Sequence, residues 1–542
     1  MYSVVIENIF FFYSDPYKNS VYWRLPADNG LFKAFQPLGA VCRVWRVVAL
    51  PYMYQFATCE LRYALDIGGI NRAVWSDNLL LIKSAGAQHM LSGLSIHVDV
   101  ANPWVVVEYL KQLDIDFITW YQFTTLRFIV GNQGVLRPQE LCPPEALELM
   151  CSFLVDTIPG LREIYTIPSE GIDTSGSFLL RLMIRRFAWR LERLNILSLT
   201  PVKLSLDSDT RLANIKHLNI QSYSELPHSF YTNVQIYSLE TLSLKPCDLD
   251  LFVTQLVCKH TVGNFRFPKL RRLTIHGPEN PTNAFIFHHQ RFKTPLLISH
   301  SPFPALEFLS LSCYSPNTSR FLRLVHTSPL HTLHLIMIGA SCLDIELSKL
   351  KDLQEIRVVV EVVGRSPMKE RFREMITQAI CRLPHLVRLD ARFMGNARFC
   401  KPVRLDTQFS QWPHSPTLQR LRLRLRTYVS PTALVRILKQ LPRLWELCVY
   451  MDVADMSEWS ARYMGTDINA ATPEPISYSA QTLCIDMLTH RPGSLHIMTS
   501  FVRIFRSLPN LRTRLFTAHV LPGIFQREMD FGRCSAENHA HW

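Results

Sequence analysis

The sequence has no Cys-x-x-Cys pair among its 13 cysteines, which stand singly along 542 residues. Cysteine pairs at that spacing are typical of zinc ribbons and thiol redox sites, so the sequence favours neither. Scattered cysteines also argue against a disulfide framework and are typical of buried thiols in a reducing compartment. We therefore expect free cysteines.

Long apolar runs are missing as well. No stretch approaches the roughly 18 uninterrupted apolar residues of a membrane-spanning helix. Residues 1–13 are apolar, but Glu7 and Asn8 interrupt them and no basic segment precedes them, which makes a poor signal peptide. We expect no membrane partner, and a cytoplasmic or nuclear location.

Catalytic motifs are also missing. The chain has only 20 glycines, and neither Gly-x-x-x-x-Gly-Lys-Ser/Thr nor Gly-x-Ser-x-Gly occurs. His288 and His289, and the pair His539 and His541 near Cys534, are short histidine groups that are usually solvated rather than metal-bound. We therefore expect no catalytic residues, no cofactor and no metal, and predict that the chain is not an enzyme.

The clearest positive signal is the stretch 239–249, which reads L-x-x-L-x-L-x-x-C-x-L. Leu242 and Leu244 alternate with polar residues, so this pattern predicts a short strand with one buried and one polar face. The small Cys247 fits where the backbone must leave the strand. One such unit cannot bury its leucines alone, so we expect it to recur along the chain.

Weaker copies do recur on both sides of this stretch. Their spacing is irregular: it is 24 residues between Leu218 and Leu242, for example, but 36 between Leu273 and Leu309. The copies share an apolar-x-x-apolar-x core and occupy residues 91–96, 123–128, 161–166, 194–199, 215–220, 270–275, 306–311, 330–335, 353–358, 386–391, 418–423 and 444–449. Prolines often stand just before the predicted strands, where they end a helix and favour an extended entry. Asn102-Pro103 and Ser430-Pro431 each precede an apolar helical period and predict helix starts.

These residues resemble the leucine-rich-repeat family, in particular its irregular, cysteine-containing, ribonuclease-inhibitor-like kind. The resemblance covers roughly residues 91–516 and implies an α/β fold: a curved solenoid with parallel strands on its concave face. The alternative is a large α/β protein whose parallel strands happen to show this pattern.

The first part of the chain differs from the rest. Residues 41–50 contain V-C-x-x-W-R, which resembles the closing helix of an F-box, and the apolar stretch 6–13 resembles its opening helix. The Leu-Pro pair that usually precedes that opening helix is missing. The resemblance implies that a small helical module binds a Skp-family adaptor through Ile6, Ile9, Phe10, Leu38, Val41 and Trp45. The alternative is a helical cap on the first strand.

The predicted organisation has four parts. They are an F-box-like helical module at 1–55, a link or degenerate first repeat at 56–90, a solenoid at 91–520 and a polar tail at 521–542. The stretches 276–303 and 456–480 are rich in proline, asparagine, serine or glycine and are predicted to be surface insertions.

A candidate binding face follows from the strand frame. The 58 lysines and arginines outnumber the 45 acidic residues, giving a net charge of +13 that favours acidic partners without requiring nucleic acid. Residues flanking the buried leucines should face one side. Near the C-terminal end these are arginines, with Asp390 among them able to neutralise one, and the predicted set is Arg388, Arg392, Arg420, Arg422 and Arg424. Nearer the middle the same frame places His217, Asn219, Thr241 and Ser243 on this side.

The two resemblances together imply a non-catalytic substrate-recognition subunit of a cullin-type (SCF) ubiquitin ligase. The concave face would then bind an acidic or phosphorylated target protein, while the first module binds the Skp-family adaptor. The alternative is a repeat scaffold without a ubiquitin role. A third interpretation, RNA binding or nuclear transport through the basic face, is less favoured.

Overall fold

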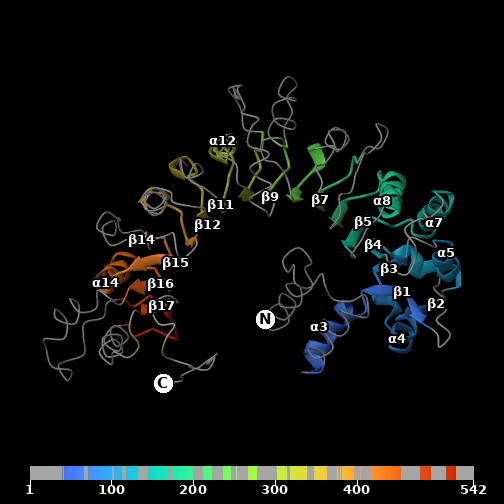
Figure 1. The fold of residues 1–542 in the computed structure, drawn as a ribbon, viewed down its shortest axis with the longest axis horizontal. Helices are drawn as coiled ribbons and strands as arrows, with labels where there is room; N and C mark the ends of the chain where they lie inside the picture. The colour runs from blue at the N-terminus through green and yellow to red at the C-terminus, as the bar shows by residue number, and fades with distance from the viewer. Residues whose placement is uncertain are drawn as a thin grey trace, which may run out of the picture. The chain divides into compact units, whose positions relative to one another are not determined.

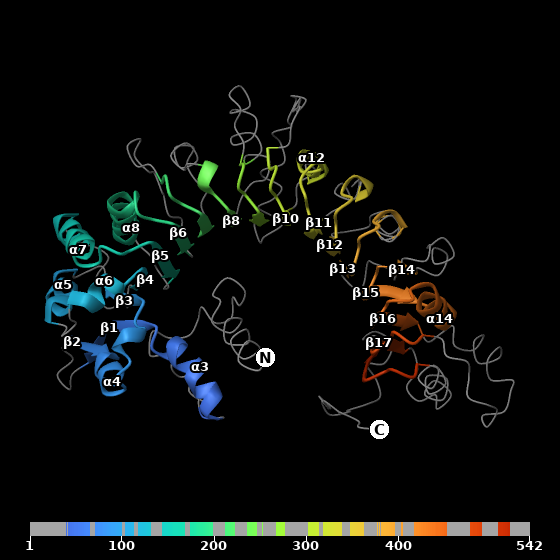
Figure 2. The same ribbon diagram turned by 180° about the vertical axis from the view of Figure 1, so that it is seen from behind.

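A computed structural model provides the structure (Figures 1 and 2). It describes residues 40, 42–65, 71–99, 103–112, 117–131, 144–168, 174–198, 212–222, 236–245, 252, 267–276, 302–313, 318–338, 347–362, 375, 377, 379, 381–395, 403–404, 417–452, 477–489 and 508–520. The chain divides into two compact units: unit 1 spans 1–315 with 327–329, and unit 2 spans 316–326 with 330–542.

Unit 1 is a row of strands with helices between them. A helix, α3 (Arg43–Met53), precedes β1 (Phe56–Leu65), β2 (Asn71–Asp77), α4 (Leu79–Ser84) and the 3-10 turn η2 (Gln88–Met90). Strands and helices then alternate: β3 (Gly93–Asp99), α5 (Pro103–Gln112), α6 (Phe117–Gln122), β4 (Thr125–Gly131), α7 (Pro144–Thr157), β5 (Glu163–Pro168), α8 (Thr174–Phe187) and β6 (Arg193–Ser198). The described elements that follow are β7 (His217–Ser222), η3 (Ile236–Ser238), β8 (Thr241–Lys245), β9 (Arg272–His276) and β10 (Phe308–Cys313).

The strands of unit 1 pair in parallel from β3 to β10, each with the next along the chain. β1 pairs in parallel with β3 and antiparallel with β2. Helices α5, α7 and α8 lie along the same side of strands β3–β6 in both views, and α7 packs against its two neighbours (Figures 1 and 2). Their buried side chains, such as Leu110, Met150 and Met183, form part of the core of this unit.

Unit 2 repeats the parallel pairing. Its described elements are α12 (Thr318–Leu324), β11 (Thr332–Ile338), η7 (Leu347–Lys349), β12 (Glu355–Val362), β13 (Arg388–Gly395), β14 (Val403–Arg404), β15 (Arg420–Val429), α14 (Pro431–Gln440), β16 (Glu446–Asp452), β17 (Thr482–Thr489) and β18 (Thr513–Val520). β11, β12, β13, β15, β16, β17 and β18 pair in parallel in that order, and the short β14 adds to the far end of β15.

The strand frame predicted from the leucine pattern is confirmed at the best-matching copy. Leu242 is 5% exposed and Leu244 is 2% exposed, whereas Thr241 and Ser243 are half-buried. Leu218, Leu242 and Leu273 stand at the same register position on three neighbouring strands, so they form a continuous buried row. Cys247 lies outside the described residues. We call the side of the strands away from these leucines the polar face.

The predicted helix starts at Pro103 and Pro431 are also confirmed. The first turn of α14 is capped because the Ser430 hydroxyl accepts a hydrogen bond from the Ala433 backbone N–H at 3.2 Å, and proline follows at the first helical position. Leu434, Ile437, Leu438 and Leu441 are buried, which fixes the helix against the strands of unit 2.

The predicted α/β class with parallel strands is therefore confirmed, with the addition of the antiparallel pair β1 and β2. The segment 56–90, expected to be a link or a degenerate repeat, holds that pair together with α4 and η2. The predicted opening helix at 6–13 and most of the stretches 276–303 and 456–480 lie outside the described residues. Within the part of the chain that the structure describes, no helix has the length and apolar character needed to cross a bilayer.

Candidate functional site

The predicted arginines lie together on the polar face of unit 2. β13 and β15 pair so that Arg388 stands opposite Arg420, Asp390 opposite Arg422 and Arg392 opposite Arg424. The leucines that alternate with the β15 arginines, Leu421 and Leu423, have no exposed surface. The side chains of Arg388, Arg392, Arg420 and Arg422 consequently project from the opposite side of the strands.

The other predicted site residues are described in part or not at all. The side chain of Arg424 is not among those described, although its backbone belongs to β15. Ile6, Ile9, Phe10, Leu38 and Val41 lie outside the described residues. Trp45 is half-buried on α3, one helical turn before the fully buried Ala49.

The prediction that Asp390 neutralises one arginine of this group is confirmed, but other carboxylates contribute as well. Arg392 does pair with Asp390, at 3.2 Å, but the strands on either side supply two further carboxylates. On β12, Glu355 lies 3.4 Å from Arg388, and on β16, Glu446 forms ion pairs with both Arg420 and Arg422. The four described arginines thus face three carboxylates, and most of the expected repulsion is removed.

Glu446 is the centre of this network. It is 5% exposed, whereas the two arginines that it binds keep about a third of their side-chain surface exposed. The Cys448 thiol donates to the Glu446 carboxylate at 3.8 Å. Burial lowers the pKa of Arg422, but the hydrogen bond and charge of Glu446 outweigh that effect and raise it overall. Arg422 is therefore held as a cation.

A second carboxylate network lies beside it on β11, β12 and β13. Glu355 stands between His334, at 3.6 Å, and Arg388. The His334 hydrogen bond contributes most to lowering the pKa of Glu355, and Arg388 adds to the effect. The polar face of unit 2 is thus a field of alternating charges with a small excess of arginine.

The polar face of unit 1 holds a stacked arginine that the sequence analysis did not identify. The guanidinium of Arg127 on β4 lies 3.6 Å from the centre of the Phe56 ring and 5.9 Å from that of Tyr165. Burial lowers the pKa of Arg127 to about 10, which leaves it cationic at neutral pH. The strand frame of 123–128 would have placed Arg127 on this face, but its partner Phe56 belongs to β1, which carries no leucine pattern.

Polar groups on β4, β5 and β6 hold Tyr165 in place. Its hydroxyl donates to Glu163 at 3.1 Å and accepts from Arg193 at 3.3 Å. The Thr125 hydroxyl also donates to Glu163, at 3.3 Å. Because Tyr165 is 4% exposed and fixed at its polar end, it gives Arg127 a rigid neighbour.

Gly93 provides the space for this stack. A β-carbon at residue 93 would lie 2.5 Å from Cε1 of Phe56 and 2.8 Å from the Thr125 carbonyl oxygen, closer than real contacts allow. We expect Gly93→Ala to lower the free energy of unfolding of unit 1 by about 1–3 kcal/mol, because the ring and the β4 backbone must both move. Chemical denaturation monitored by circular dichroism measures this. An unchanged midpoint would show that the ring moves aside freely.

Further along unit 1, the predicted residues His217 and Asn219 occupy the polar face of β7. The Asn219 amide donates to Asn195 on β6 at 2.9 Å, and His217 bonds to the Thr241 hydroxyl at 2.8 Å. Burial, followed by the nearby charge of Arg193, lowers the pKa of His217, so the imidazole is neutral at pH 7. Hydrogen bonds between uncharged side chains thus link β6 to β7 and β7 to β8 on this part of the face.

The structure adds two observations on metals and thiols. Among the described residues, no three histidine, cysteine or acidic side chains gather as a metal site would require. His288, His289, His539 and His541 are outside those residues. Of the six described cysteines, which form no disulfide with one another, Cys59, Cys151 and Cys448 are buried, whereas Cys42 is exposed.

The sequence was compared with models of known protein families and with curated proteins, and nothing matches in either comparison.

Proposed function

We propose that the chain is a non-catalytic substrate-recognition subunit of a cullin-type ubiquitin ligase, with an F-box-like first module and leucine-rich repeats that bind the target. The observation that carries the binding role is the polar face of unit 2. There, in-register strands present rows of arginine and carboxylate side chains whose backbone positions are fixed by a buried leucine row.

The target that suits this face is an acidic or phosphorylated protein segment. Arginines outnumber carboxylates among the described charged side chains of β13, β15 and their neighbours, and a guanidinium can form two parallel hydrogen bonds to carboxylate or phosphate. Ion pairs on this face hold the arginine side chains in place, so less conformational entropy is lost when a partner binds.

The adaptor role depends on the first module. Helix α3 carries the residues Arg43 to Arg46 at the end of the V-C-x-x-W-R stretch, with Cys42 as its N-cap, and Tyr54 and Gln55 join it to β1. Val47 on this helix is 63% exposed, next to the half-buried Val48. Val47 is therefore the position on this helix at which an adaptor contact can be tested.

Coexpression with a Skp-family adaptor tests this proposal. We expect the chain expressed alone to be poorly soluble, because an F-box without its adaptor exposes apolar surface, predicted around Ile9, Phe10 and Leu38. The adaptor should raise the soluble yield and co-elute with the chain on a sizing column. Val47→Asp should weaken the complex, since a carboxylate would be buried at the contact.

Leu80→Asp is the matched control. Leu80 is 80% exposed on α4, so the same kind of change there should leave adaptor binding intact. Equal solubility with and without the adaptor, together with no complex on the column, would leave the scaffold without a ubiquitin role as the better interpretation.

A further inference from the structure

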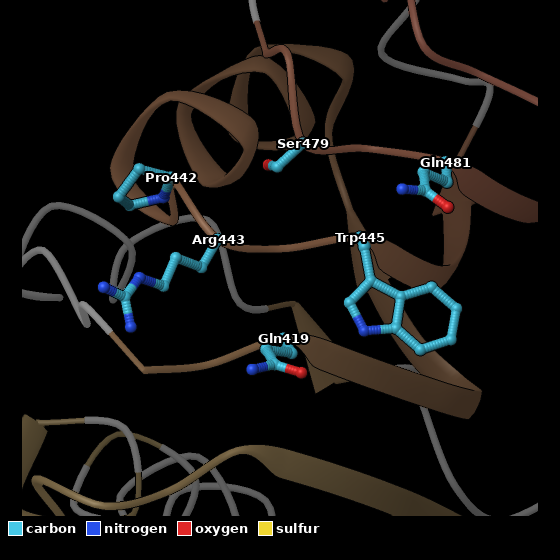
Figure 3. A pocket seen from close by; sticks show the side chains of 6 residues that line it. All are labelled: Gln419, Pro442, Arg443, Trp445, Ser479 and Gln481. Atoms are coloured by element: carbon cyan, nitrogen blue, oxygen red, sulfur yellow. The ribbon is translucent and has the colours of Figure 1, made fainter.

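A pocket of about 520 Å³ lies at the entry of strands β15, β16 and β17 in unit 2. Gln419, Trp445 and Gln481 hold the same position, one residue before each strand. The backbone N–H of Trp445 donates to the backbone carbonyl of Gln419 at 2.9 Å. The backbone N–H of Gln481 donates to the backbone carbonyl of Trp445, also at 2.9 Å. The strand pairing thus places the Trp445 indole between the side-chain amides of Gln419 and Gln481. Pro442, Arg443 and Ser479 complete the lining (Figure 3).

The backbone around the pocket is fixed, but its main polar side chains are not used by the fold. The Ser479 hydroxyl donates to the Leu444 carbonyl at 2.9 Å, which ties the turn before β17 to the turn before β16. In contrast, the Gln419 and Gln481 amides, the Arg443 guanidinium and the Trp445 indole N–H have no side-chain hydrogen-bond partner within the described part of the chain. Gln419, Gln481 and Arg443 are exposed, and Trp445 is half-buried.

Trp445 is held in place from the polar face. The Arg420 guanidinium lies 4.3 Å from the centre of the indole and is itself paired with the buried Glu446. An aromatic ring that is already fixed loses little conformational freedom on binding, which is why such rings often dominate interfaces. Trp445 therefore joins the pocket to the arginines of the polar face through Arg420, although Arg420 itself does not line the pocket.

We propose that this pocket binds an extended, acidic peptide segment of a partner protein. A glutamine amide offers a donor and an acceptor together, and so can pair with the N–H and C=O of a peptide backbone. The indole provides a flat surface for an apolar side chain. Arg443 stands at the opposite side of the pocket from Trp445 (Figure 3), where its guanidinium can pair with a carboxylate elsewhere along the peptide.

The composition of the lining favours a peptide over a nucleic acid. Arg443 is the single charged residue among the six that line the pocket, whereas single-stranded nucleic acid requires a basic groove that follows its backbone. No acidic residue is among the six, which suits a carboxylate. The inference deepens the proposed function and rests on it for the claim that the peptide belongs to a ubiquitination target.

A phage-displayed library of random 12-residue peptides, selected on the full-length chain, is the probe. We expect the enriched peptides to carry an Asp or Glu near an apolar residue. Fluorescence anisotropy with an enriched peptide should give a Kd that rises about 10-fold or more in the double variant Gln419→Ala with Gln481→Ala, because two amide pairs to the peptide are lost. Arg443→Gln should weaken binding several-fold and reduce its dependence on salt.

Gln354→Ala is the matched control. Gln354 is an exposed glutamine at the same position before β12, outside the pocket, so its loss should leave the Kd unchanged. The inference is overturned if the enriched peptides lack acidic residues, if they bind the double variant as well as the parent chain, or if an oligouridylate binds with the same losses. Adaptor co-elution is measured separately. A chain that binds the adaptor but selects no peptides contradicts the peptide pocket alone. A chain that selects peptides but forms no adaptor complex contradicts the ubiquitin role alone.

Discussion

Leu242→Ala should lower the free energy of unfolding of unit 1 by about 2–5 kcal/mol. Leu242 is 5% exposed and lies between Leu218 and Leu273 on the neighbouring strands, so its loss opens a cavity in the middle of the buried row. The neighbouring Ser243→Ala should change stability by no more than about 0.5 kcal/mol, because that side chain is on the polar face.

The two variants are best compared by hydrogen exchange together with chemical denaturation, since repeat arrays need not unfold in a single step. Each strand here pairs with its two neighbours along the chain, so lost protection should spread from β8 to β7 and β9 before it reaches β1. A similar loss for Ser243→Ala would contradict the observed strand frame, in which one residue separates the buried side from the polar one.

The leucine pattern predicted the strands from β3 to β13, together with β15 and β16, because a buried position tolerates few residue types. β17 was not predicted. Its buried residues are Leu483 and Ile485, but Ala480 stands where the other copies have a larger apolar residue. This segment also directly follows the predicted insertion 456–480, and without a large apolar residue at position 480 it was not distinguished from the end of that insertion.

β1 was missed for a related reason. Ala57 and Cys59 hold the buried positions that Leu94 and Ile96 hold on β3. Small residues at these positions remove the leucine signal while keeping the alternation, and the antiparallel partner β2 has no place in a repeat of helix, proline and parallel strand. The Arg127 stack depends on Phe56 of β1, so it could not be found without that strand.

The candidate site was predicted in part. The strand frame placed the arginines of β13 and β15 side by side, because residues at equal distances from aligned leucines come into register. The same frame also contains Glu355 and Glu446 at the first position of β12 and β16. Aligning β12 and β16 with β13 and β15 by their buried residues would have placed these two carboxylates beside the arginines.

Glu446→Gln should be the most damaging conservative change on the polar face of unit 2. The substitution keeps the shape of the side chain but removes the charge that binds Arg420 and Arg422. Breaking a fully buried ion pair costs roughly 3–5 kcal/mol. Each arginine here remains about one-third exposed and can be partly hydrated, so we expect a loss of about 2–3 kcal/mol in the free energy of unfolding of unit 2.

Glu355→Gln supplies the matched comparison, because Glu355 pairs with Arg388 in the same face but keeps 35% of its side-chain surface exposed. That variant should lose less than about 1 kcal/mol, as exposed pairs do. Urea denaturation of the two variants at low and high salt separates them: the effect at Glu446 should persist in salt, while the effect at Glu355 should shrink. If both variants lose the same small amount, the Glu446 network does not hold this face together. Glu446→Gln makes the face more positive, which by charge alone would strengthen capture of an acidic partner. If this variant nevertheless weakens that capture while Glu355→Gln does not, the fixed geometry of Arg420 and Arg422 matters for binding.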